Sequence, residues 1–234
     1  MKDNLEVTVF HGSPRKGNTY TATTIFTEEL KIHGSVNITE FYLPKAMPEF
    51  CIGCQKCLGS HSSNCPHAEY VEPILAAILK SDALIFATPH FAANMSGAMK
   101  NLLDHLDFLI MNVAPRKEIF QKRAFIITTG SGSAAAIKPI RNFLLNWGVN
   151  RVYSMGIRMF TDKWEKMPAK KQERIERKLR KAANHFFNVE VKRPHFSSVF
   201  MYHVFKYIIK RYIGEGNYPF EYWKEQGYFA KRPF

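Results

Sequence analysis

Apolar positions along this chain follow two patterns, one typical of strands and the other typical of helices. Strands are predicted where apolar residues alternate or form short continuous runs, at 5–9, 36–43, 82–88, 124–129 and 149–158. Helices are predicted where apolar residues recur every three or four positions, at 20–32, 72–80, 96–106, 133–147 and after Pro168. Because the two kinds of element alternate, the pattern predicts a parallel sheet with helices on both faces.

The predicted architecture is α/β, a flavodoxin-like doubly wound sheet of five parallel strands in the order 2-1-3-4-5. In such sheets, ligands bind beyond the carboxyl ends of the strands, at the point where the strand order reverses. We therefore expect the loops at 12–19, 88–96 and 129–134 to share one rim. The helix after Pro168 is expected to face the core with Ile175, Leu179, Ala182 or Ala183, and Phe186.

The loop at 12–19 joins the first strand to the first helix and has the chemistry of a phosphate site. A helix amino terminus offers unpaired backbone N–H groups and a partial positive charge. The candidate phosphate-binding side chains combine short donors with positive charge: Ser13, Arg15, Lys16, Asn18 and Thr19. The loop has neither the ending of a triphosphate loop nor the spacing of a dinucleotide loop, which favours a mononucleotide. An ordinary turn with a solvated Arg–Lys pair is the alternative.

The other two loops carry small polar residues and a few rings. The second loop supplies the candidate contacts Thr88, Pro89, His90, Phe91, Ala92, Asn94, Met95 and Ser96, and the third supplies Thr129, Gly130, Ser131 and Gly132. His90 and Phe91 suit a pocket for a flat ring, and Asn94 offers both a donor and an acceptor. A surface histidine and a flexible turn at 130–133 are the alternatives.

All four cysteines lie in one polar insert at 44–69. Their spacing, Cys51-x2-Cys54-x2-Cys57-x7-Cys65, lets three thiolates wrap one face of an iron–sulfur cube while the fourth closes it. Zinc sites usually separate two cysteine pairs by about a dozen residues or more, so the spacing favours a [4Fe–4S] cluster. Four reduced thiols are the alternative, and we assign no ligand role to His61 or His67.

These motifs together resemble a known family. Residues 12–19 resemble the FMN-phosphate loop of the flavodoxin-like NAD(P)H-dependent FMN reductases, and residues 88–104 resemble that family's ring-binding loop and following helix. The family more often has Tyr or another aromatic residue where this chain has His90 and Phe91. The cysteine run is similar to that of the iron–sulfur flavoprotein branch. The resemblance covers residues 1 to about 190 and, loosely, 222–227.

The resemblance implies FMN as cofactor, NAD(P)H as co-substrate and a [4Fe–4S] cluster as one-electron partner. It implies an FMN-dependent oxidoreductase that passes electrons between NAD(P)H or a protein donor and a quinone, a flavin or a one-electron acceptor. We name no catalytic side chain, because hydride transfer to a flavin requires no acid or base. Two alternatives stay open: an NAD(P)H-dependent FMN, quinone or nitro reductase without a cluster, and a non-catalytic flavodoxin-like electron carrier.

Composition changes this picture only in detail. The 234 residues carry a net charge of +13, and residues 162–234 hold 17 Lys and Arg against 8 Asp and Glu. Such an excess attracts anionic partners, but no nucleic-acid motif accompanies it, so we expect no nucleic-acid partner. No stretch reaches the ~20 apolar residues of a membrane span, and the amino terminus has no apolar signal region. We therefore expect a cytoplasmic protein.

The chain is expected to divide into an FMN-binding domain at 1–190 and an aromatic, basic helical extension at 191–234. The extension is predicted to contain a helix from Ser197 or Ser198 to about Ile213, then an irregular aromatic arm at 218–229. This much aromatic surface needs cover, so we expect it to pack on the domain or on a second subunit, in a homo-oligomer (dimer or tetramer). Contact of the helix with a membrane surface is the alternative.

Overall fold

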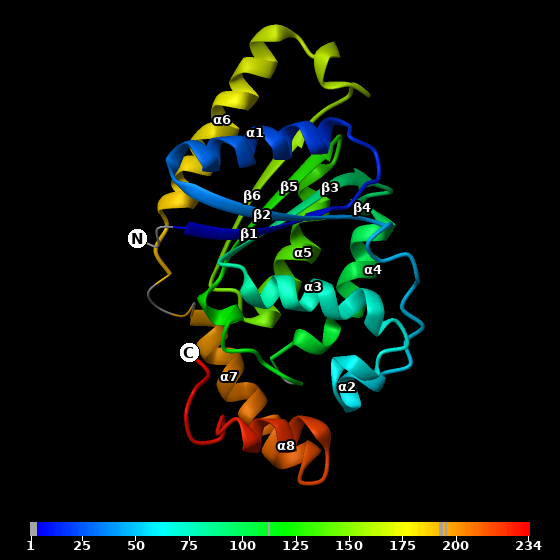
Figure 1. The fold of residues 1–234 in the computed structure, drawn as a ribbon, viewed down its shortest axis with the longest axis vertical. Helices are drawn as coiled ribbons and strands as arrows, with labels where there is room; N and C mark the ends of the chain where they lie inside the picture. The colour runs from blue at the N-terminus through cyan, green and yellow to red at the C-terminus, as the bar shows by residue number, and fades with distance from the viewer. Residues whose placement is uncertain (1–3, 112, 192–193, 195) are drawn as a thin grey trace.

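The computed structural model describes residues 4–111, 113–191, 194 and 196–234 (Figure 1). Its main strands lie in the order β2 (Ser35–Tyr42), β1 (Asn4–His11), β3 (Ala83–Phe91), β5 (Arg123–Gly130) and β6 (Arg151–Arg158), each parallel to its neighbours. The predicted order 2-1-3-4-5 is confirmed, since these are the five parallel strands counted along the chain. A two-residue strand, β4 (Asn94–Met95), adds an antiparallel pair at the end of β3.

Helices cover both faces of the sheet, as predicted (Figure 1). One face carries α1 (Asn18–His33) and α6 (Ala169–Asn188), and the other carries α3 (Ala68–Lys80), α4 (Gly97–His105) and α5 (Ser133–Trp147). Successive side chains of a strand point to opposite faces. Residues Leu84 and Phe86 of β3 therefore join the core under α3, α4 and α5, while Ala83 and Ile85 join the core under α1 and α6.

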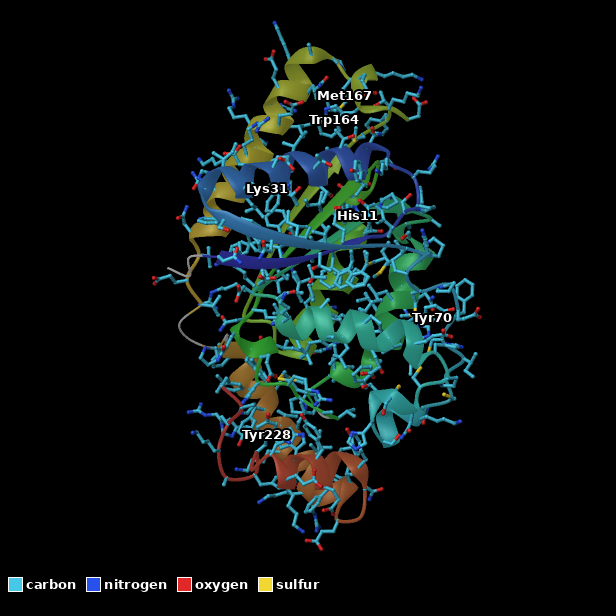
Figure 2. All side chains as sticks on the ribbon, viewed as in Figure 1. His11, Lys31, Tyr70, Trp164, Met167 and Tyr228 are labelled. Atoms are coloured by element: carbon cyan, nitrogen blue, oxygen red, sulfur yellow. The ribbon has the colours of Figure 1, made fainter. Side chains whose placement is uncertain are left out.

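The predicted core face of α6 is confirmed. Its buried residues are Ile175, Leu179, Ala183 and Phe186. Phe186 packs against Phe26 of α1 and Phe125 of β5, with ring centroids 5.8 and 5.6 Å apart. Trp164, in a 3₁₀ turn at Trp164–Lys166, and Met167 belong to the same core and lie where α6 begins, at one end of the molecule (Figure 2).

Two boundaries differ from the prediction: the start of α3, after the cysteine insert, and the end of β3. Helix α3 begins at Ala68 and not at 72, and β3 continues to Phe91 because β4 pairs with its end. The insert contains the short helix α2 (Lys56–Gly59) and a 3₁₀ turn at Ser62–Asn64. Two further 3₁₀ turns lie at Asp107–Leu109 and Ile119–Gln121.

The carboxy-terminal extension is more regular than predicted. Helix α7 (Phe196–Ile208) continues as a π-helical turn (Ile209–Ile213), and the segment expected to be an irregular arm begins with helix α8 (Tyr218–Glu225). The prediction was wrong there because Pro219, in the first turn of α8, begins a helix as readily as it interrupts one.

The extension packs on its own chain at the end of the molecule opposite Met167 (Figure 2). Tyr202 of α7 stacks on Trp223 of α8 with centroids 5.6 Å apart, and its hydroxyl donates to the Tyr228 carbonyl at 2.8 Å. The Tyr222 hydroxyl donates to the Pro115 carbonyl at 3.0 Å, which ties α8 to the domain. Among the described residues, no helix has the length and apolar character that crossing a bilayer requires.

Candidate functional site

A cleft of ≈ 430 Å³ opens at the carboxyl ends of β1, β3 and β5, where the predicted rim was placed. Its size falls in the range of small-molecule sites. Several predicted site residues line it: Ser13, Arg15, Lys16, Asn18, Thr19, Pro89, His90, Phe91, Thr129 and Gly130. Gly17 and a segment after β6 complete the wall, with Met159, Thr161, Asp162 and Lys163. This last segment was not among the predicted contacts.

Helix α1 points its amino terminus into the cleft and begins without a side-chain cap, because its N-cap residue is Gly17. The first turn of a helix leaves N–H groups without an intrahelical partner. Together with the helix dipole, these groups favour an anion. The exposed side chains of Arg15 and Lys16 add positive charge at the same end. The arrangement suits a phosphate group.

Two buried polar atoms in the cleft wall, Asn18 Oδ1 and Thr161 Oγ1, have no hydrogen-bond partner among the residues that the structure describes. Asn18 Nδ2 donates to the Thr161 carbonyl at 2.9 Å, so the two residues are held side by side. Buried polar groups without partners are rare in folded proteins and call for a ligand or water. A ligand with phosphate oxygens and hydroxyl groups, such as FMN, would satisfy both atoms, so the residues present fit this cofactor.

Hydroxyl groups join the loops of the rim to one another. Thr19 Oγ1 lies 2.6 Å from Thr129 Oγ1, which links the first loop to the third. Ser96 Oγ donates to the Gly12 carbonyl at 2.5 Å and caps α4 by accepting from Met99 N at 3.2 Å. These bonds hold the first and second loops in register.

The predicted contacts Thr88 and Ser96 are buried beneath the rim and do not appear in the cleft lining of the described chain. Thr88 Oγ1 accepts from Ser96 N at 3.1 Å. A methyl group on Gly12 would lie 2.8 Å from Thr88 Oγ1 and 2.9 Å from Ser96 Oγ, so only glycine fits between these hydroxyls. In this structure the two residues position the loops.

His90 packs against the third loop. A methyl group on Gly132 would lie 2.6 Å from His90 Cε1, and one on Gly130 would lie 2.9 Å from His90 Cβ. The φ of +137° at Gly130 also requires glycine. Ser131 is exposed beside this contact, and neither it nor Gly132 lines the cleft within the described chain.

The tip of the second loop is a tight hairpin between β3 and β4. Its two central residues, Ala92 and Ala93, have φ values of 44° and 60°, a region that costs an L-residue about 1–2 kcal/mol. The hairpin leaves Phe91 half exposed at the cleft mouth. Asn94 Oδ1 accepts from Met95 N at 2.8 Å, and the described part of the cleft wall contains none of Ala92, Asn94 and Met95.

The four cysteines are free thiols in the insert; Cys51 and Cys54 are exposed, and Cys57 and Cys65 are half-buried. Burial raises the pKa of the Cys57 thiol to about 11, and the neighbouring thiols, Cys65 foremost, contribute to the shift. Among the described residues, no three cysteine sulfurs lie within 4.8 Å of one another. A single tetrahedral zinc ion would need sulfurs about 3.8 Å apart. In the described chain, three cysteines are therefore not placed to share one zinc ion.

Helix α4 holds both ends of the cysteine run. Asn101 Oδ1 accepts from Cys51 N at 3.0 Å, and Asn101 Nδ2 donates to the Glu49 carbonyl at 2.8 Å. One turn later, His105 Nε2 lies 2.9 Å from His67 Nδ1. The backbone N–H of His67 donates to Cys65 Sγ at 3.4 Å. Burial lowers the pKa of His105. The sequence signal for these anchors was the pair of polar residues on the otherwise apolar face of α4.

Comparison with protein families gives a match over residues 5–161 to the family described as NADPH-dependent FMN reductase. An iron–sulfur flavoprotein of Clostridioides difficile (strain 630) is 26% identical over 232 residues, 94% of this chain and 98% of the relative. An iron–sulfur flavoprotein of Methanocaldococcus jannaschii is 25% identical over 199 residues, 79% of this chain and 96% of the relative.

Solved structures show the same fold at low identity. The NAD(P)H:quinone oxidoreductase of Methanothermobacter marburgensis superimposes with a TM-score of 0.62 at 16% identity, over 80% of this chain and 99% of that one. An azoreductase of Bacillus anthracis str. Sterne gives 0.61 at 14% identity, over 78% and 100% of the two chains.

Proposed function

This chain belongs to the NADPH-dependent FMN reductase family, and from that premise we propose that it is an iron–sulfur flavoprotein. Membership makes it an NAD(P)H-dependent, FMN-containing oxidoreductase. The finer proposal is that it holds FMN in the cleft and a [4Fe–4S] cluster on Cys51, Cys54, Cys57 and Cys65. It would then pass electrons between NAD(P)H or a protein donor and a quinone, a flavin or a one-electron acceptor.

The uncapped start of α1, beside the unpartnered atoms of Asn18 and Thr161, is the observation that carries the FMN proposal. We assign the phosphate to this helix terminus, with Ser13, Arg15, Lys16 and Thr19 around it. When bound, FMN exchanges hydride with NAD(P)H and releases electrons singly. The protein's part is to bind the phosphate, fix the ring along the rim and limit water at the cleft.

The remaining predicted residues receive supporting roles in the proposal. Pro89, His90, Phe91, Thr129 and Gly130 border the space for the ring because they line the cleft. Thr88 and Ser96 keep the loops in place through their buried bonds. The backbone around Ala92, Asn94, Met95, Ser131 and Gly132 lies beside the mouth and is proposed to contact the ring edge or the co-substrate.

The cluster proposal draws support from the names of the relatives, which are iron–sulfur flavoproteins. In this chain, four free thiols lie in one short insert, and the backbone N–H of His67 donates to Cys65 Sγ. We propose a cytoplasmic location, since a compact run of thiols suits a reducing compartment.

We further propose a homo-oligomer. Helix α7 and the π-helical turn that follows it leave four aromatic side chains exposed: Phe196, Phe200, Tyr207 and Tyr212. Large apolar groups gathered in this way usually mark a contact surface. Light scattering on the purified full chain should give a dimer or tetramer mass, and a monomer mass would contradict the proposal.

The function is tested by anaerobic purification followed by an absorption spectrum and assays for flavin, iron and sulfide. We expect near-stoichiometric FMN, a broad iron–sulfur shoulder and steady oxidation of NAD(P)H with added quinone. Flavin bands without iron would exclude the cluster and leave a cluster-free reductase as the function. Flavin without NAD(P)H turnover would leave an electron carrier, and absence of bound or added FMN from the cleft would remove the redox assignment.

The phosphate site is tested by Asn18→Asp. The change loses the Asn18 Nδ2 bond to the Thr161 carbonyl, but an acidic residue in the first turn of a helix is stabilising, so the thermal midpoint should fall only slightly. FMN affinity should fall at least about tenfold, because like charges roughly 4 Å apart repel by a few kcal/mol near a protein surface. Asn184→Asp, on the exposed side of α6, is the matched control. Unchanged FMN binding by Asn18→Asp would contradict the phosphate assignment.

A further inference from the structure

Three side chains from two parts of the chain converge at the end of the cysteine insert. Ligand atoms of Cys65, His67 and His105 all lie within 4.8 Å of one another. Cys65 and His67 belong to the insert just before α3, and His105 is the last residue of α4. His105 is 2% exposed, whereas Cys65 and His67 are half-buried, so the group has a buried side and a side open to solvent.

The hydrogen bonds of His105 fix which of its nitrogens carries a lone pair. His105 Nδ1 lies 3.0 Å from the Asn101 carbonyl, which can only accept, so Nδ1 carries the hydrogen. The lone pair is then on Nε2, the atom that faces His67 Nδ1 at 2.9 Å. A histidine that donates one ring N–H to a backbone carbonyl and presents the other nitrogen is the usual arrangement of a metal-ligating imidazole.

A buried carboxylate oxygen lies on the neighbouring helix. Glu72 belongs to α3, five residues after His67, and within the described chain its Oε1 is buried and has no hydrogen-bond partner. Its carboxylate is not among the described atoms that lie within 4.8 Å of all three ligand atoms. Cys65, His67 and His105 therefore supply three ligands and leave a fourth position for water.

We propose that Cys65, His67 and His105 form a mononuclear site for a divalent transition metal of the zinc type, with water as the fourth ligand on the side open to solvent. Thiolate, imidazole and carboxylate are the donors that zinc takes in proteins. On binding, the Cys65 thiol loses its proton to solvent and the sulfur bonds to the metal. His67 moves its hydrogen from Nδ1 to Nε2 and stays neutral.

The geometry needs little adjustment. Zinc–nitrogen bonds of about 2.0–2.1 Å at tetrahedral angles place two nitrogens about 3.3 Å apart. The present separation is 2.9 Å, so the half-exposed His67 ring has to move by a few tenths of an ångström while His105 stays fixed on α4. The helix therefore supplies the rigid ligand and the insert supplies the adaptable ones.

This site shares Cys65 with the proposed cluster, so the two metal centres exclude each other on one chain. The inference goes beyond the proposed function, because it concerns a different metal centre and does not require a cluster to form. A zinc-loaded chain would lack its fourth cluster thiolate, and metal supply would decide which centre forms.

The test uses Co²⁺ as a spectroscopic probe on the full chain, made metal-free with a chelator and a reductant under anaerobic conditions. The parent for this test is the double variant Cys51→Ser/Cys54→Ser, which cannot complete a four-thiolate cluster but keeps all the residues of the proposed site. We expect Co²⁺ to bind with a thiolate-to-cobalt charge-transfer band and the visible bands of tetrahedral coordination. Zinc should displace the cobalt.

Single changes on this background identify the ligands. Cys65→Ser should abolish the charge-transfer band, and His67→Ala and His105→Ala should each weaken Co²⁺ binding by at least about tenfold to a hundredfold. His61→Ala, an exposed histidine of the same insert, is the matched control and should bind like the parent. Circular dichroism checks that each variant is folded, and the half-exposed His67 keeps the test decisive if His105→Ala does not fold.

Two results would overturn the proposal. One is the absence of a sulfur-to-cobalt band in the double variant. The other is Co²⁺ binding by folded His67→Ala that is as tight as the parent's, which would leave the two histidines as a structural hydrogen-bonded pair. Neither result bears on FMN, and neither depends on iron content, so the metal site and the proposed function fail separately.

Discussion

The cleft and the cysteine insert are built in different ways, although α4 touches both. The loops around the cleft are held by hydrogen bonds to one another. The hydroxyls of Thr19, Thr88 and Ser96 pair with groups on neighbouring loops, and a methyl group on Gly12 would clash with two of them. The insert is held from outside, mainly by Asn101 and His105 of α4. Its sulfur atoms are exposed or half-buried, and a methyl group on Gly59 would meet nothing within 4 Å.

The difference indicates that the sheet fixes the first site, whereas the second depends on a few side chains and on the metal it binds. Folding alone completes the rim, because its hydrogen bonds follow from the strand order. The insert gains its final geometry when a metal replaces the protons of its thiols. Changes in the two regions should therefore have separable effects on stability and on cofactor content.

The largest effect is expected from Gly12→Ala. The added methyl group would lie 2.8 Å from Thr88 Oγ1 and should lower the free energy of unfolding by about 1–3 kcal/mol, with loss of retained FMN. The matched change in the insert, Gly59→Ala, meets open space and should be neutral or slightly stabilising. Denaturant unfolding and flavin content measure both variants; equal stability of the two would remove the contrast between the regions.

Asn101→Ala should weaken the attachment of the cysteine insert to α4. It removes the acceptor for Cys51 N and the donor to the Glu49 carbonyl, at a cost of about 1–3 kcal/mol for the groups left unpaired. We expect the iron content of Asn101→Ala to fall while FMN is retained. Asn101→Asp keeps the acceptor, so its iron content should lie between those of the parent and Asn101→Ala. If the ratio of iron to FMN stayed constant across this series, the two sites would not be separately held.

The smallest effect concerns His11, at the carboxyl end of β1 (Figure 2). Burial lowers the pKa of His11 from 6.5; its 2.8 Å bond to Glu40 opposes the shift, and Lys16 adds to it. A pKa that is lower in the folded than in the unfolded chain makes stability fall as the pH drops from about 6.5 to the lowered value. Tyr42, stacked on His11, stays neutral in this range, since burial raises its pKa.

Urea midpoints measured from neutral to mildly acidic pH should therefore decline below about pH 6.5 and then level off. His11→Gln should flatten part of this decline. An identical pH profile for the variant would show that groups other than His11 cause the decline.

Much of the cleft could be predicted because strand order and helix termini are local consequences of the sequence. The alternation at Leu5, Val7 and Val9 defines β1, and the loop after it then has to lie at the rim. The wall at 159–163 was missed, since the approach of that segment depends on how β6 ends next to Asn18, far away in the sequence.

Other features followed from tertiary contacts that no local pattern reveals. His67 and His105 are 38 residues apart and meet only because α3 and α4 lie on the same face of the sheet. The sequence predicts Thr88 as a ligand contact because it lies in a polar loop. In the structure it is buried, and its hydroxyl accepts from Ser96 N. The residues assigned to FMN and to the cluster remain predictions, and the experiments above test them.

Helix α4 has one more consequence. It has nine residues, Gly97–His105, and at about 1.5 Å of rise per residue it sets its two ends about 12–13 Å apart. Ser96, beneath the cleft rim, and His105, at the insert, thus stand at opposite ends of one short helix. The separation between the two sites is therefore set by the length of this helix and not by the sheet.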